Sequence, residues 1–170
     1  GSTALYERLG DERAFSLVEN CLASMASCTI EAQGRVVKTI GDAVLSVFGS
    51  ASAAASSAVA MQRRVEALGP AASVELCLRI GFHFGPVVER DGDVFGDTVN
   101  LASRLQDLTK TYAWPVLISE STYQQVKDEF ETEFADAVTV KGKTQSVNVY
   151  KVIGWKDAPE SEKLQPWAGR

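Results

Sequence analysis

Residues 34–45 read GRVVKTIGDAVL. Apolar residues dominate both halves of this stretch, and Gly41 and Asp42 separate them, a pattern typical of a β-hairpin. We therefore predict strands at 35–40 and 43–48, with the carboxylate of Asp42 at the tip of the turn.

Helical and strand patterns alternate on both sides of this hairpin. Apolar residues recur near every 3.6 positions in the helical segments, while Gly34 and Ser50 are typical of a helix end and a helix start. We expect helices at 3–9, 11–33, 50–68, 97–108 and 121–130, and further strands at 74–88, 115–119, 134–140 and 147–153. A hairpin within such an alternation predicts an α+β domain of the ferredoxin-like plan, with a mainly antiparallel sheet covered by helices. The segment 156–170 has little apolar content and is expected to be a loose tail or linker.

The composition fits one globular domain of 170 residues, with 45% hydrophobic and 23% charged residues. A net charge of −5 argues against binding to a nucleic-acid polymer, but a single nucleotide needs only a few local cations. The three cysteines form no CxxC pair, which indicates reduced thiols in a cytoplasmic domain. No apolar run approaches the ~20 residues of a membrane span.

The carboxylate of Asp42 has two interpretations. A Gly-Asp pair is common in hairpin turns for conformational reasons alone. Mg²⁺, however, is usually held by one or two carboxylates together with the phosphates of a substrate. A carboxylate at the tip of two apolar strands therefore supplies half of a metal site, which needs a second carboxylate.

Strand alternation places Lys38 on the same face as Val36 and Ile40. A lysine there can be an edge-strand residue whose stem packs while its head stays in water. It can also donate a hydrogen bond to a base, with Asp93 accepting one from an exocyclic amine. A lysine and an aspartate suit the edge of adenine, whereas guanine would need acceptors for N1–H and the 2-amino group.

Polar residues in three other places allow a structural and a functional interpretation. Asn100 and Arg104 lie four residues apart and so share one helix face. They are either a solvated surface pair or ligands of a ribose and a phosphate. Lys141 and Lys143 are either solvated turn lysines or ligands of a terminal phosphate. His83 alternates with apolar residues and is interpreted as structural, and a single histidine argues against a zinc site.

Together these segments closely resemble the catalytic domain of class III nucleotidyl cyclases, the adenylate and guanylate cyclase family. The resemblance covers residues 1–155 and leaves out the tail. Its landmarks occur in the family's order: GSTAL at 1–5, VKTIGD at 37–42, LRIGFHFGPV at 78–87, GDTVNLASR at 96–104 and VKGK at 140–143.

The resemblance implies an adenylate cyclase that makes cyclic AMP from ATP as a head-to-tail homodimer. Two Mg²⁺ or Mn²⁺ ions per site would activate the ribose 3′-hydroxyl and steady the triphosphate. The matching positions are Asp42 for a metal ligand, Lys38 and Asp93 for the adenine-selecting pair, Asn100 for ribose orientation, Arg104 for the transition state and Lys141 for phosphate contact. Asp42 would serve one site of the dimer while Asn100 and Arg104 of the same chain serve the other.

Three departures from the family's pattern accompany this resemblance. The first metal aspartate would stand three residues before Gly1, so we expect it on a strand upstream, and a regulatory domain elsewhere in the full-length protein. Pro86 stands where some relatives have a phosphate-binding arginine, and residues 89–92 form a short link where many have a longer dimerisation arm.

Two alternatives stay open: a guanylate cyclase, disfavoured by Lys38 and Asp93, and a non-catalytic cyclase homology domain that binds nucleotide or pairs with a partner.

Overall fold

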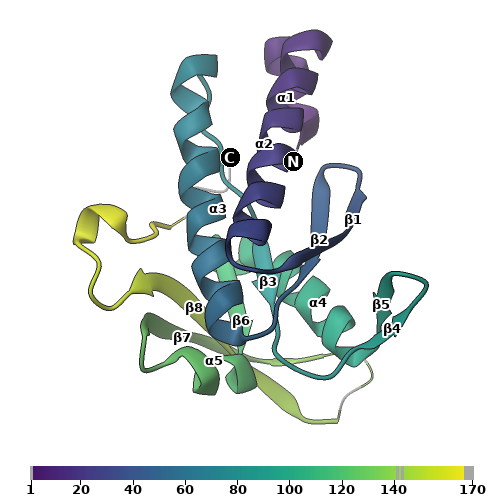
Figure 1. Cartoon of the computed structure of the whole chain (residues 1–170). Coiled ribbons are helices and arrows are strands. Elements are labelled where there is room, and N and C mark those ends of the chain that lie inside the picture. Colours follow the sequence, from purple (N-terminus) through teal and green to yellow (C-terminus); the bar gives the residue numbers. More distant parts are fainter. Residues whose placement is uncertain (1, 141, 143, 167–170) are drawn as a thin grey trace.

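The computed structural model of the chain describes residues 2–140, 142 and 144–166 (Figure 1). Helices and strands alternate as the sequence indicates. In chain order the elements are α1 (Ser2–Leu9), α2 (Asp11–Glu31), β1 (Arg35–Ile40), β2 (Ala43–Val47), α3 (Ala51–Ala72), β3 (Ile80–Phe82), β4 (Val88–Arg90), β5 (Asp93–Phe95), α4 (Asp97–Tyr112), β6 (Val116–Ser119), α5 (Glu120–Val126), β7 (Phe130–Thr139), β8 (Ser146–Trp155) and the 3₁₀ turn η1 (Glu160–Glu162).

The main sheet has four strands in the order β3-β6-β8-β7. β3 pairs with β6 in parallel, and the other two pairings are antiparallel, so the prediction of an α+β fold with a mainly antiparallel sheet is confirmed. Two further pairs, β1–β2 and β4–β5, form separate hairpins. Figure 1 shows both hairpins on the side of the molecule away from η1.

The prediction of one long strand at 74–88 is wrong. Only Ile80–Phe82 joins the sheet, and Val88–Arg90 belongs to a separate hairpin. Before β3, the backbone N–H of Leu78 donates to the side chain of the buried Gln62 at 2.9 Å. Because this donor is satisfied by a helix side chain, no strand ladder is needed there.

The ends of two helices also differ from the sequence pattern. α2 ends in a Schellman motif whose left-handed residue is Gln33, with a φ of 59°, and not Gly34. Gly34 is needed for another reason, because a Cβ there would lie 2.6 Å from the ring of Phe48. The predicted helix 121–130 ends at Val126, because Phe130 opens β7 and is buried in the core.

One hydrophobic core joins the sheet to α3, α4 and α5. Its largest fully buried apolar side chains are Phe130, Leu105, Leu117 and Ile118. Leu164, beyond η1, is also buried there, and its N–H donates to the carbonyl of Ile153 at 2.8 Å. Residues 156–166 therefore pack against the domain where the sequence suggested a loose tail, and a domain boundary at 155 stays a prediction.

Candidate active site

The β1–β2 hairpin contains an irregularity that the sequence pattern does not reveal. Val36 opposes Ser46 and Lys38 opposes Leu45, so Val37 is an extra residue on β1, a β-bulge. A bulge interrupts side-chain alternation. The predicted common face of Val36 and Lys38 therefore does not hold, and Arg35 lies on the side of Lys38 instead, since both contact the β4–β5 hairpin.

Lys38 and Asp93, the predicted base-reading pair, are in direct contact. The Lys38 Nζ donates to Asp93 Oδ2 at 2.6 Å, and Asp93 Oδ1 accepts from the N–H of Val94 at 2.8 Å. The hydrogen bond from Lys38, followed by that from Val94, holds the pKa of the Asp93 carboxyl below its ordinary value. Asp93 is therefore a carboxylate at neutral pH, and it is 28% exposed, so it can still meet a ligand.

Arg35 is a neighbour of this pair that the sequence reasoning missed. Its Nη2 donates to Glu89 on β4, and its Nη1 donates to the carbonyl of Gly92 at 3.4 Å. Gly92 directly precedes Asp93. No sequence signal identifies Arg35, because strict alternation would place it on the opposite face of β1 from Lys38.

Helix α4 presents Asn100 and Arg104 to solvent. An adjoining face, about a quarter turn around the helix, carries Leu101, Leu105 and Leu108, all of which are buried in the core. This amphipathic pattern fixes the rotation of the helix and leaves the polar pair on its outer face. The prediction that Asn100 and Arg104 share one face of a helix is confirmed, since both lie within α4, whereas their roles stay predictions.

A close backbone contact between β3 and α4 fixes the distance of this helix from the sheet. A Cβ on Gly81 of β3 would lie 2.2 Å from the backbone nitrogen of Gln106 and 2.5 Å from the carbonyl of Ala102. Only glycine permits this contact. The glycine of the RIGF segment therefore determines where Asn100 and Arg104 stand relative to the sheet.

Asp42 lies exposed in the β1–β2 turn. Its carboxylate is a hard oxygen donor, which suits Mg²⁺ or Mn²⁺. Within residues 2–140, 142 and 144–166, however, no three His, Cys, Asp or Glu side chains are placed to hold a metal ion together. The metal-binding role of Asp42 therefore stays a prediction. Lys141 and Lys143 lie outside the described residues.

His83 has the surroundings of a structural residue. Its Nδ1 lies 2.5 Å from the hydroxyl of Ser119 and 3.4 Å from that of Ser121, and Ser119 is buried. These contacts join the residue after β3 to the end of β6 and the start of α5. The structural interpretation of His83 fits this arrangement.

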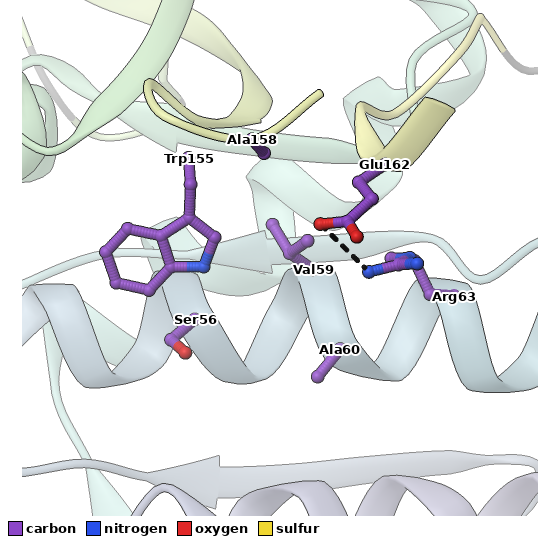
Figure 2. Close-up of a pocket in the computed structure, with 7 residues that line it drawn as sticks. All are labelled: Ser56, Val59, Ala60, Arg63, Trp155, Ala158 and Glu162. Carbon is purple, nitrogen blue, oxygen red and sulfur yellow. Dashed lines mark ion pairs between the residues drawn. The ribbon is translucent and has the colours of Figure 1, made fainter. Parts of the chain in front are cut away.

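A pocket of about 190 Å³ lies elsewhere, between α3 and the segment after β8 (Figure 2). Its lining is Ser56, Val59, Ala60, Arg63, Trp155, Ala158 and Glu162. Arg63 and Glu162 form an ion pair of 3.6 Å across it. None of the candidate site residues lines this pocket.

The family model of the adenylate and guanylate cyclase catalytic domain matches residues 1–154. The chain belongs to this family. The cyclase domain is 31% identical over 173 residues to an adenylate cyclase of Anabaena cylindrica, covering 89% of the chain and 34% of that relative. It thus spans about a third of the length of this curated relative.

Solved structures also resemble this cyclase domain. One is the catalytic core of a rhodopsin-guanylyl cyclase with converted specificity in complex with ATPalphaS, with a TM-score of 0.78, 28% identity and coverage of 91% of this chain and 90% of that one. Another is the adenylyl cyclase CyaB from P. aeruginosa, with a TM-score of 0.75 and 24% identity, covering 94% and 92%. The latter similarity shows the fold alone. Among the described residues of this cyclase domain, we find no helix that is long and apolar enough to cross a membrane.

Proposed function

We propose that the chain is the catalytic domain of an adenylate cyclase, which converts ATP to 3′,5′-cyclic AMP and pyrophosphate. The observation that carries the proposal is the contact between Lys38 and Asp93. It sets a cationic donor beside an anionic acceptor, and adenine presents ring-nitrogen acceptors beside an amino donor. Guanine presents a donor at N1, which this pair matches less well.

Asn100 and Arg104 would act on the ribose and the phosphates. The exposed amide of Asn100 can hydrogen-bond the ribose, and the guanidinium of Arg104 can donate to phosphate oxygens that gain negative charge in the transition state. The 3′-oxygen forms a bond to the α-phosphorus, and the bond from that phosphorus to the bridging oxygen breaks. Pyrophosphate leaves with that electron pair, and the 3′-hydroxyl proton is released. Lys141 would contact the departing phosphates.

Asp42 would hold a divalent cation, Mg²⁺ or Mn²⁺, with two ions serving each site. Such an ion, when bound, makes a hydroxyl more acidic and neutralises phosphate charge. Among the described residues of one chain, no three His, Cys, Asp or Glu side chains are placed to hold such an ion together. We therefore place the complete site between two copies of the chain, with Asp42 of one copy facing Asn100 and Arg104 of the other.

Two other functions have specific support. A guanylate cyclase is compatible with the family, which includes both activities. A non-catalytic domain that binds nucleotide or pairs with a partner is favoured because the described residues bring no three potential metal ligands together.

The chain's three free thiols support a cytoplasmic location. A regulatory domain elsewhere would fit a chain that spans a third of its Anabaena relative.

Product analysis tests the proposal. The full-length protein is incubated with ATP or GTP and with Mg²⁺ or Mn²⁺, and the products are separated by chromatography. We expect cyclic AMP, and its loss in Asp42→Ala but not in Asp128→Ala, which removes another exposed carboxylate near a turn. Cyclic GMP as the main product would make the protein a guanylate cyclase. A folded dimer that forms neither product would establish the non-catalytic alternative.

A further inference from the structure

The β4–β5 hairpin has little apolar anchoring. All three residues of β4 are exposed, and in β5 only Val94 is buried. Asp93 stands at the first position of β5, directly after the two-residue turn of Asp91 and Gly92. The place of the Asp93 carboxylate relative to β1 therefore depends on polar contacts between the two hairpins.

Arg35 and Lys38 supply those contacts from one side of β1. The bulge at Val37 brings both side chains to the same side of the strand, although they are three residues apart. Lys38 binds Asp93 itself, whereas Arg35 binds Glu89 on β4 and the Gly92 carbonyl in the turn. Arg35 thus spans the hairpin from one strand to its turn, using the fork geometry that lysine lacks.

We propose that Arg35 is a positioning residue for base recognition: it fixes the β4–β5 hairpin so that Asp93 stays beside Lys38. Arg35 needs no contact with the nucleotide for this role. The proposal rests on the proposed function, because the pair that Arg35 holds in place is the one assigned to adenine. It also explains why an exposed arginine bonds a carbonyl that directly precedes a candidate base-reading residue.

The expected effect is modest and selective. Arg35 and Glu89 are 47% and 60% exposed, and exposed ion pairs contribute little to stability. Arg35→Ala should therefore leave the fold intact and release only the hairpin. Amide exchange of residues 88–95 should accelerate by about two- to five-fold, and the preference for ATP over GTP in kcat/KM should fall by a similar factor.

The test compares Arg35→Ala with Arg64→Ala in the full-length protein. Arg64 forms a similarly exposed pair with Glu31, between α3 and α2, so its loss is a matched control. Hydrogen exchange of residues 88–95 and the carboxyl titration of Asp93, followed by ¹³C NMR, are recorded without nucleotide. ATP and GTP turnover is measured separately. Arg35→Lys, which keeps the positive charge but lacks the fork that reaches both Glu89 and the Gly92 carbonyl, serves as the conservative variant.

We expect faster hairpin exchange and a higher Asp93 pKa in Arg35→Ala, a smaller change of both in Arg35→Lys, and no change in Arg64→Ala. Unchanged exchange and titration in Arg35→Ala would overturn the proposal even if turnover fell. A looser hairpin with an unaltered nucleotide preference would overturn it too. Absence of any cyclic product from the unaltered protein would instead count against the proposed function, and the two nucleotide-free measurements would still report on Arg35.

Discussion

Gly81→Ala should damage the candidate site from a distance. The added Cβ would lie 2.2 Å from the nitrogen of Gln106 and 2.8 Å from the carbonyl carbon of Leu105, both on the backbone of α4. Neither atom can rotate away, so β3 and α4 must separate by about 1 Å to restore ordinary contact. Overpacking of this kind costs about 1–3 kcal/mol of unfolding free energy.

The same displacement moves the face that carries Asn100 and Arg104. A misplacement of about 1 Å in a catalytic group can lower the rate by about 10²-fold. We therefore expect Gly81→Ala to remain folded, with a lower free energy of unfolding in urea and about 10²-fold less cyclic AMP formation. Urea denaturation followed by circular dichroism measures the first effect, and chromatography of the product measures the second.

Gly49→Ala is the matched control. No atom lies within 4 Å of the Cβ that it would add, so its stability should change by less than about 0.5 kcal/mol and its activity should not change. A Gly81→Ala protein as stable and as active as Gly49→Ala would refute the reasoning that close packing at Gly81 positions α4.

Two further predictions concern the polar residues themselves. Arg104→Ala should lower kcat by about 10²–10³-fold, because it removes a positioned donor to the transition state. The circular dichroism spectrum should stay unchanged, because the side chain is exposed. An unchanged kcat would show that Arg104 does not belong to the site. Lys38→Ala should alter the pH dependence of stability. The Asp93 pKa lies below its ordinary 3.8 in the folded chain, so the stabilisation by Lys38 is present above about pH 4 and is lost as pH falls through the folded-state pKa. Urea midpoints of the unaltered protein and Lys38→Ala should therefore converge as pH is lowered, and a constant difference would contradict the assignment.

Much of the fold could be predicted because its signals are local. The Gly-Asp turn predicts the β1–β2 hairpin, and Ser50 predicts the start of α3, where its hydroxyl accepts from the N–H of Ala53 at 3.1 Å. The errors come from contacts between distant segments. Gln62 satisfies the backbone at Leu78, so the strand expected there does not form, and Leu164 returns to the core from a segment of polar composition.

The candidate site likewise combines residues that the sequence could predict with one that depends on contacts between distant segments. Residue types together with the resemblance to the cyclase family selected Lys38 and Asp93, which the structure joins at 2.6 Å. They were not enough to find Arg35, because its place depends on the bulge at Val37, and a bulge comes from pairing with a partner strand. Nor does the sequence spacing identify a second carboxylate that would bind a metal ion together with Asp42.

Mixing two inactive variants tests the account's central claim most directly. Asp42→Ala and Arg104→Ala each damage both sites of a homodimer, but a mixed dimer has one site with both alterations and one site with neither. With free exchange of subunits in an equal mixture, about one quarter of all sites are intact. The account predicts cyclic AMP formation from ATP at about one quarter of the unaltered rate. A mixture no more active than its separate components, under conditions where subunits exchange, would contradict an adenylate cyclase site shared between two copies of this chain.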